Sequence, residues 1–351
     1  MPVSIFEPRT LIGVWEQAKR AKRFLQQLCF QPNYQSLTEH IDMDEVQSNR
    51  IMASFVPLEG RGKTVARTGF QAKTYTPPKV APNFITKELD LQARQPGETL
   101  YRGLDPAQRD VELVLRDLIA LDDKITRREE WMRAQLMFTG QVVMEGDGYS
   151  ETLDFTHTMT ETLEDGNLWS ADTAVPLEDL NRWALAVAAE TGIMPMCCVM
   201  AGDTWRAFRN NAQVAAERDK FKQALMQLQP RNDPRGGRYM CTITLEEAGD
   251  IDVYTYPEWY EDIVAGTLTR SPMVPSGKLC LCNPEDSFIM AHGAYIDLST
   301  TPATVSAADR YPRSWYEAGP NQRFLEMVSR PLVAPTRTNA WYIAQVIEPA
   351  A

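Results

Sequence analysis

The chain has 351 residues, of which 44% are hydrophobic and 24% are charged. This is the composition of a globular protein with room for one large domain or two or three smaller ones. The 36 Lys and Arg residues are outnumbered by 47 Asp and Glu residues, giving a net charge of −11, which argues against a module that grips nucleic-acid phosphates with clustered cations. No apolar run approaches the roughly 20 residues that span a bilayer, and the N-terminus lacks the basic and apolar regions of a secretory signal.

The six cysteines are too few for a disulfide framework in a chain of this length. On a strand, Cys280 and Cys282 would point to the same face, where two thiols could bind a metal ion. The three histidines, however, do not stand at metal-finger spacing, and several cysteines lie inside apolar runs. We therefore expect buried, reduced thiols in a reducing cytoplasm, with no metal and no cofactor.

Residues 1–48 are interpreted as an arm rather than a domain, with one short amphipathic helix over 11–28. Its basic residues are interpreted as a solvated face, with contact to an acidic partner as the alternative; they are Lys19, Arg20, Lys22 and Arg23. Residues 49–92 differ, because apolar and polar residues alternate over 51–56, 64–70 and 84–91, as in strands with one covered face. The cationic, Gly- and Pro-marked stretch 59–79 predicts a protruding β-ribbon rather than an idle loop.

A helix of about 33 residues is predicted to begin at Asp105-Pro106 and to end at Gly140. The aspartate can cap its N-terminus, the proline suits the first helical position, and apolar residues recur at helical spacing over 111–136. At 1.5 Å per residue it would be about 50 Å long, enough to span the body of the molecule. Two adjacent acidic pairs, Asp122-Asp123 and Glu129-Glu130, are expected to lie on its solvated side.

Helices and strands are mixed in the remainder of the chain without regular βαβ order. The pattern predicts, in sequence, a hairpin over 141–158, a helix over 176–191 ended by Gly192, a strand over 194–200, helices over 203–211 and 213–229, a hairpin over 239–256, and strands within 279–298 and 322–347. This mixture favours an α+β protein with two lobes over a doubly wound nucleotide-binding fold.

The sequence carries no convincing catalytic motif. Gly62-Lys63-Thr64 imitates the end of a phosphate-binding loop, but Pro57 stands where that loop needs a glycine. His157 falls on the polar face of a predicted strand, and His292 has no serine or cysteine nucleophile pattern near it. We therefore predict no catalytic residues.

Two segments carry a resemblance to a known family. Near the C-terminus stand Asp309-Arg310-Tyr311-Pro312-Arg313-Ser314-Trp315, Gly319, Phe324 and Met327-Val-Ser-Arg-Pro331-Leu332. This segment resembles the lambda-type phage major capsid proteins (the lambda E family), which carry R-Y-P-x-x-W, a glycine and then a strand ending in S-x-P-L. In the ribbon, Ala53-x-Phe55-Val56-x-Leu58 and Tyr75-Thr-Pro77-Pro78-x-Val80-x-Pro82 are similar to theirs, with Pro78 replacing the usual glycine. The resemblance covers nearly the whole chain and is weakest across 195–300.

The resemblance implies the Hong Kong 97-type phage capsid fold, which is α+β. Its parts would be an N-terminal arm (1–48), an E-loop β-ribbon (49–92), a peripheral domain with a spine helix at about 106–139 (93–175 and 320–351), and an axial domain (176–319). The last strand would rejoin the peripheral sheet, and the boundary inside 300–325 stays open. The resemblance also implies structural roles for the motif residues Arg310, Tyr311, Pro312, Trp315, Gly319, Phe324 and Pro331.

The implied function is that of a major capsid (head) protein, not an enzyme. Such a protein self-assembles as pentamers and hexamers into the icosahedral shell that encloses phage double-stranded DNA, and it resides in the virion after assembly in the host cytoplasm. Implied partners are further copies of the chain, a scaffold protein, a portal and a decoration protein; the DNA is enclosed without sequence-specific binding, and no membrane is involved. The alternatives are a bacterial nanocompartment shell protein of the same fold and an α+β enzyme with a pocket of convergent titratable groups.

For assembly, we expect the ribbon to contact neighbouring subunits through Arg61, Lys63, Arg67, Lys73 and Tyr75. The arm is expected to stay intact in the mature shell, with scaffolding supplied by a separate protein. Lys63, Lys73 and Asn339 are residue types that cross-link in some capsids of this fold, but no carboxylate is evident beside the lysines, so non-covalent contacts are expected. Deleting 1–48, or replacing 58–80 by a short turn, is expected to leave a folded chain that closes no shells.

Overall fold

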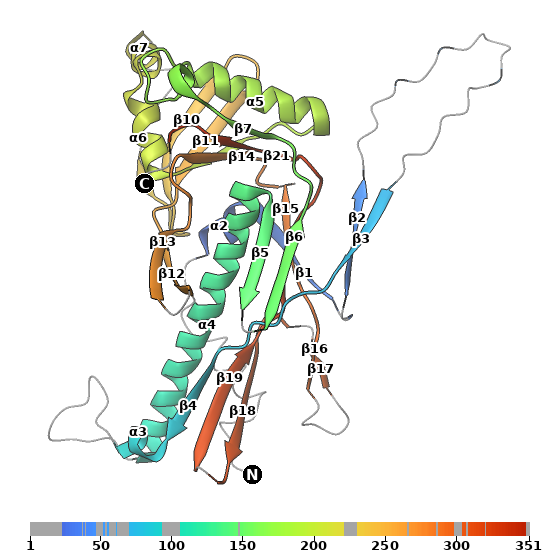
Figure 1. Cartoon of the computed structure of the whole chain (residues 1–351), viewed down its shortest axis with the longest axis vertical. Coiled ribbons are helices and arrows are strands. Elements are labelled where there is room, and N and C mark those ends of the chain that lie inside the picture. Colours follow the sequence, from blue (N-terminus) through green and yellow to red (C-terminus); the bar gives the residue numbers. More distant parts are fainter. Residues whose placement is uncertain are drawn as a thin grey trace.

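The computed structural model describes residues 23–36, 38, 40–46, 52, 55, 61, 70–92, 106–146, 148–220, 230–264, 267–285, 287–297, 304–306, 308–319 and 321–348. These residues form two lobes along the long axis of the molecule, joined by one long helix (Figure 1). Helices and strands are mixed, so the α+β prediction is confirmed.

The joining helix, α4 (Pro106–Thr139), has 34 residues and confirms the predicted long helix. Apolar side chains of its first half pack with Leu325 and Met327 in a small separate core; they are Val114, Leu118, Leu121 and Ile125. Its second half enters the largest core of the described chain. Gly140 follows with a φ of 75°, and a Cβ there would lie 2.8 Å from His157 Cβ, so this helix end requires a glycine.

The upper lobe is built on a seven-stranded mixed sheet with three helices beside it (Figure 1). The strand order is β7 (Thr160–Thr162), β21 (Trp341–Gln345), β14 (Lys278–Cys282), β8 (Cys197–Met200), β11 (Gly249–Thr255), β10 (Arg238–Leu245) and β9 (Arg231–Asn232). The helices are α5 (Pro176–Thr191), α6 (Gly202–Asn210) and α7 (Ala212–Lys220). These elements confirm the predictions between residues 176 and 256, as far as the described residues extend.

The last strand lies in this sheet, whereas the resemblance implied that it would rejoin the sheet of the peripheral domain. β21 pairs antiparallel with β14 and parallel with β7. Its first four residues, Trp341 to Ala344, are all buried. A strand that buries consecutive residues needs cover on both faces, which a place inside a packed sheet provides. Residues 320–351 are therefore divided between the lobes.

The lower lobe contains a three-stranded antiparallel sheet of β18 (Tyr311–Glu317), β19 (Gln322–Val328) and β4 (Asn83–Lys87). The strand predicted over 84–91 ends at Lys87, where α3 (Glu88–Gln92) begins. The Lys87 amide donates a hydrogen bond to Asp90 Oδ2 at 2.8 Å, and a side-chain acceptor three residues ahead favours a helical turn. The hairpin predicted after α4 is confirmed as β5 (Gln141–Gly146) and β6 (Tyr149–Asp154).

The segment that ends at residue 35 is built into the core, which corrects the prediction of an arm over all of 1–48. The side chains that α2 (Phe24–Cys29) buries are Phe24, Leu25, Leu28 and Cys29. β1 (Phe30–Gln35) pairs in parallel with β15 (Phe288–His292), which also pairs with β20 (Pro331–Pro335). Residues 1–22, with most of the helix predicted over 11–28, lie outside the described residues.

A ribbon projects away from both lobes (Figure 1). It consists of β2 (Ile41–Val46) and β3 (Phe70–Tyr75), paired antiparallel, so its first strand lies in the range assigned to the arm. Between these strands the structure describes Met52, Phe55 and Arg61. Of the strands predicted over 51–56 and 64–70, the structure describes only Met52, Phe55 and Phe70, so it does not test them.

Two smaller hairpins and a short helix complete the described elements. The hairpins are β12 (Trp259–Val264) with β13 (Thr267–Pro272), and β16 (Tyr295–Asp297) with β17 (Thr304–Ser306). The 3-10 helix η1 (Asp165–Asn167) lies between β7 and α5. Among the described helices, none combines the length and the apolar character needed to cross a membrane.

Candidate functional site: a buried charge network on the long helix

The long helix α4 carries a row of buried polar side chains on one face. Spacings of four, three and four residues place its members on the same side of the helix; they are Asp122, Thr126, Glu129 and Arg133. Each is at most 4% exposed, and Glu130 beside them is 1% exposed. The prediction that Asp122, Glu129 and Glu130 are solvated is therefore wrong, because buried cations of α4 itself and of other segments pair with these carboxylates.

Arg310 of the C-terminal motif lies at the centre of this network. Its Nε donates to Asp122 Oδ1 at 2.8 Å, and its Nη1 and Nη2 donate to the two oxygens of Glu129 at 2.5 and 3.0 Å. Burial raises the pKa of Glu129, but the Arg310 charge and hydrogen bonds from His292 and Arg310 outweigh it and hold that pKa well below its usual range. Two-pronged pairing of this kind also fixes the orientation of the guanidinium.

The N-terminal segment joins the same network. Arg23 Nη2 lies 3.5 Å from Asp122 Oδ1 and donates to Thr126 Oγ1 at 3.2 Å. The backbone amides of Leu25 and Gln26, in the first turn of α2, donate to the two oxygens of Glu130 at 3.1 and 3.2 Å. Glu130 on the long helix therefore satisfies amides that α2 itself leaves without partners.

Arg133 and His292 complete the set, which we call the charge network: Arg23, Asp122, Glu129, Glu130, Arg133, His292 and Arg310. Arg133 Nη1 donates to Glu130 Oε1 at 2.8 Å, and His292 Nε2 lies 3.4 Å from Glu129 Oε1. Three arginines face three carboxylates, which is the balance that buried charges require. These groups are buried and pair with one another, so they join distant segments of the chain instead of meeting a substrate.

The aromatic motif residues lie close to Arg310. Tyr311 donates from its hydroxyl to Asp297 Oδ2 at 2.7 Å, and Pro312 beside it is buried. Trp315 stacks on Phe324 across the β18–β19 pair, with ring centroids 5.1 Å apart and planes within 4°. These contacts lie within one chain and hold the lower sheet together.

The two remaining motif residues differ in what the structure shows. Pro331 begins β20 and pairs with His292 on β15, so the motif reaches the sheet that holds β1. Gly319 lies in the exposed turn between β18 and β19, where a Cβ would meet nothing within 4 Å. The structure does not explain why position 319 is a glycine.

His157, predicted on a polar face, is largely enclosed. Its ring stacks on Trp341 with centroids 3.9 Å apart and planes within 8°, and its Nε2 donates to the Met159 carbonyl oxygen at 3.0 Å. Burial lowers the pKa of His157 to about 4. The neutral imidazole of His157 lies between Trp341 of β21 and Gly140 at the end of α4. It therefore has a packing role and is not a catalytic base.

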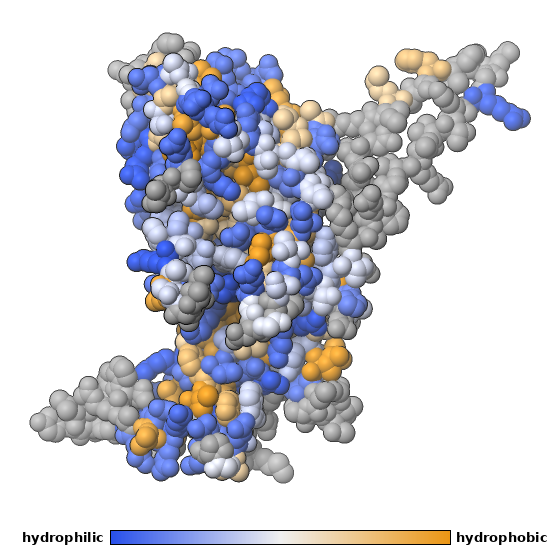
Figure 2. Space-filling model, in the orientation of Figure 1, coloured by the Kyte–Doolittle hydropathy of each residue, from blue (hydrophilic) through white to orange (hydrophobic). Residues whose placement is uncertain are grey.

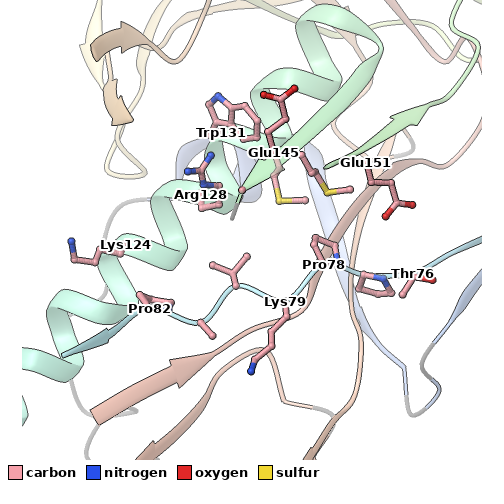
Figure 3. Close-up of a pocket in the computed structure, with 15 residues that line it drawn as sticks. Thr76, Pro78, Lys79, Pro82, Lys124, Arg128, Trp131, Glu145 and Glu151 are labelled. Carbon is pink, nitrogen blue, oxygen red and sulfur yellow. The ribbon is translucent and has the colours of Figure 1, made fainter. Parts of the chain in front are cut away.

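A groove of about 730 Å³ lies between the 76–82 segment, α4 and the β5–β6 hairpin. Figure 3 shows Lys124, Arg128 and Trp131 entering it from α4, with Glu145 and Glu151 on the hairpin side. Methionines and prolines form its apolar lining. The lining of this described groove contains no histidine, cysteine or serine.

Three cysteine sulfurs, of Cys29, Cys197 and Cys282, lie within 4.8 Å of one another and could ligate a soft metal ion. The cluster is buried and includes no fourth donor among the described residues. Three thiolates in an apolar core would leave net negative charge without a cationic partner, which is costly. The cluster therefore does not fit a resident metal.

The expected contact residues of the ribbon lie largely beyond the described residues. Arg61 is exposed, Lys63 and Arg67 lie outside, and only the backbone of Lys73 in β3 is described. Tyr75 packs on Phe155 of its own chain with ring centroids 5.6 Å apart, so it anchors the base of the ribbon.

Sequence reasoning missed two apolar residues of the ribbon. Met52 is 88% exposed and Phe55 is 105% exposed. Figure 2 shows hydrophobic surface on the extension that projects from the body. The available signal was their position within a segment predicted to protrude.

These features define the Hong Kong 97-type capsid fold, as solved structures show. The putative capsid protein of a prophage of E. coli CFT073 has a TM-score of 0.71 and 18% identity, with 97% of this chain and 98% of that chain covered. A phage-related protein of Bordetella bronchiseptica has a TM-score of 0.52 and 11% identity, with 99% and 100% covered.

The family follows from the sequence match. Residues 7–346 match the family model of phage major capsid protein E, so the chain belongs to this family. The major capsid protein of enterobacteria phage P21 is 23% identical over 98% of this chain and 100% of its own length. That of Escherichia phage lambda is 21% identical over 94% and 96%. The chain is a major capsid protein of a phage virion, which is a structural role and not an enzymatic one.

Proposed function

We propose that the chain closes an icosahedral shell of pentamers and hexamers around double-stranded DNA, and that the ribbon between β2 and β3 supplies the adaptable contacts. The observation that carries this is the exposure of Phe55 (105%) and Met52 (88%), which lie in the sequence between the two strands of the projecting ribbon, β2 and β3. Extended segments bury large areas on a neighbour while they pivot at their bases, which suits subunits in several environments.

The proposed domain assignment follows the capsid fold, with changes that the pairings require. The arm becomes residues 1–22, because 23–35 are in the core. The E-loop ribbon includes β2 as well as β3. The lower lobe with the spine helix α4 corresponds to the peripheral domain, and the seven-stranded sheet with β21 corresponds to the axial domain.

The groove beside α4 is the proposed receptor for the ribbon of a neighbouring copy. Its methionine and proline lining suits the exposed Phe55. Glu145 and Glu151 on the hairpin side, opposite Lys124 and Arg128 of α4, suit the ribbon cations. Arg61 is the described example of these cations, and Lys63, Arg67 and Lys73 are proposed to act with it. Charge pairing at such an edge sets orientation and register more than it sets affinity.

The contacts are proposed to be non-covalent. Asn339 Oδ1 accepts from the Thr158 amide at 3.0 Å, and its Nδ2 donates to Thr158 Oγ1 at 2.9 Å. An asparagine held by its own chain is poorly placed to meet a lysine of a neighbour, so boiled shells should run as single subunits on a denaturing gel.

The proposed partners are a scaffold protein, a portal and a decoration protein, with assembly in the host cytoplasm. The net charge of −11 supports a wall that encloses DNA without binding it in a sequence-specific way. The family match and both capsid relatives favour this role over the nanocompartment shell that the sequence left open.

Phe55→Ser tests the proposal. Because Phe55 is fully exposed in the subunit, the variant should keep the wild-type melting temperature of unassembled subunits. Its yield of closed shells, counted by electron microscopy, should fall at least tenfold. Wild-type shell yield from Phe55→Ser would show that the ribbon does not make the contacts proposed for it.

A further inference from the structure

Three cysteines from segments far apart in the sequence meet inside the largest core. Cys29 is the last residue of α2, Cys282 is the last residue of β14, and Cys197 begins β8 directly opposite Cys282. Cys29 Sγ lies 3.3 Å from Cys282 Sγ. All six cysteines of the chain are buried and free, so these thiols are in contact without being bonded.

We propose that Cys29 and Cys282 are a modification site at which oxidation joins the N-terminal segment to the central sheet through a disulfide. Two sulfur atoms at 3.3 Å need to approach by little more than 1 Å to reach the bond length of about 2.05 Å. The bond would link residues 253 positions apart. In the chain-entropy account, closing so long a loop removes much freedom from the unfolded state.

Cys29 is the better partner for Cys282 on geometric grounds. Cys197 and Cys282 are fixed by the hydrogen-bonded ladder between β8 and β14, which resists the approach that a bond needs. Cys29 is the last residue of a six-residue helix that Glu130 holds at its start, and it lies outside a strand ladder, so it is less constrained than Cys197. Tying this helix to the sheet would also tie Arg23 and β1, its neighbours in the chain, to the body.

The two thiols differ in acidity, and the reaction needs one thiol that loses its proton more readily than the other. Hydrogen bonds from the thiols of Cys197, Cys280 and Cys29 hold the pKa of Cys282 below its usual range. Hydrogen bonds to Cys197 and Cys282, together with burial, raise the pKa of Cys29. Cys282 is therefore the more acidic thiol of the pair and the first group to react.

The oxidant is hydrogen peroxide, which is small enough to enter during local openings of the core. The Cys282 thiolate attacks one peroxide oxygen, the O–O bond breaks, and a sulfenic acid forms with release of hydroxide. The sulfur of Cys29 then attacks the sulfenic sulfur, the S–O bond breaks, and the disulfide forms with release of a second hydroxide. The proton of Cys29 and one proton from solvent convert both hydroxides to water, so two electrons pass from two thiols to one peroxide.

For the virion, the inference rests on the role as a shell protein. Assembly takes place where thiols stay reduced, and the released particle meets an oxidising exterior. The cross-link would thus form after assembly, in the released particle.

The test uses full-length unassembled subunits treated with hydrogen peroxide or with dithiothreitol. The subunits are then denatured in the presence of N-ethylmaleimide, which alkylates free thiols, and their peptides are mapped by mass spectrometry. We expect two thiols to escape alkylation after peroxide, one linked peptide pair containing Cys29 and Cys282, and a melting temperature about 4–8 °C above that of the reduced chain. Because subunits are measured, the result does not depend on whether shells form.

Two variants control the assignment. Cys198→Ala changes a buried cysteine that packs in the other large core, and it should keep the peroxide-dependent link. Cys29→Ala should lose both the link and the rise in melting temperature. Six alkylated thiols after peroxide, a link between Cys197 and Cys282, or a link that survives Cys29→Ala would each overturn the proposal. If Cys29→Ala does not fold, the peptide map of the wild type decides alone.

Discussion

Arg310 and Glu129 are 181 residues apart in the sequence and form a two-pronged ion pair that water does not reach. The pair joins the C-terminal motif to the middle of the long helix, and Glu129 also meets His292 from β15. Arg310, which belongs to the family motif, thus stabilises the subunit itself rather than a contact between subunits.

Arg310→Leu should destabilise the subunit by about 3–5 kcal/mol, because it leaves Asp122 and Glu129 buried without their main cation. Arg310→Lys keeps the positive charge but loses the two-pronged pairing of the guanidinium, so it should lower the free energy of unfolding by less. Urea unfolding of unassembled subunits measures both. The control is Arg127→Leu, an exposed arginine on the same helix, which should change the free energy of unfolding by less than about 0.5 kcal/mol. Equal effects of Arg310→Leu and Arg127→Leu would contradict the role given to the network.

Gly237→Ala should destabilise the subunit by about 1–3 kcal/mol, because its Cβ would lie 2.2 Å from the buried ring of Phe24. The matched control is Gly202→Ala at the start of α6, where a Cβ meets nothing within 4 Å. The expected cost should largely vanish when Gly237→Ala is measured in a Phe24→Ala background, because the clash is then removed. Additive costs in that double variant would show that the two positions do not touch.

The stability of the subunit should fall as the pH drops from about 6.5 toward 4. The pKa of His157 is lowered from 6.5 to about 4 in the folded state, so in this window the unfolded chain binds a proton that the folded chain does not. The contribution is complete above pH 6.5 and amounts to about 2 kcal/mol lost by pH 5. His157→Phe keeps a ring against Trp341 and should remove this part of the pH dependence. Identical pH profiles of wild type and His157→Phe would exclude His157 as the cause.

Deleting residues 1–22 should leave a folded subunit, whereas deleting 1–30 should not. The longer deletion removes five buried apolar side chains, Phe24, Leu25, Leu28, Cys29 and Phe30. At about 1.5–3 kcal/mol each, their loss matches the whole stability of a typical protein. Circular dichroism during heating distinguishes the two: a cooperative transition for the first and none for the second. A cooperative thermal transition of the 31–351 chain would show that residues 23–30 are not needed for the core and belong to the arm.

Local patterns in the sequence predict an element well where residues that begin and end a helix are present. α4 and α5 each carry a proline at the start and a glycine just after the end, and their bounds follow from it. Five of the seven residues from Phe24 to Phe30 are apolar, which indicates burial, but the surrounding prolines favour an extended arm.

Long-range pairings could not be read in this way. Nothing local indicates that β21 inserts between β7 and β14, or that Arg310 meets Asp122 and Glu129. The spacing of Asp122, Thr126, Glu129 and Arg133 did contain the information that one face of α4 is polar. Whether such a face is solvated or paired depends on segments almost 200 residues away.

The most direct test of the account is electron microscopy of the purified full-length chain beside a variant in which residues 47–69 are replaced by a short Gly-Ser turn. This replacement keeps β2 and β3 as well as the buried Pro77 and the Val80–Ser329 bridge, which a replacement of 58–80 would destroy. The account predicts closed shells of uniform size from the wild type, and only folded subunits with a cooperative melt from the variant. Shells from the variant at wild-type yield would contradict it.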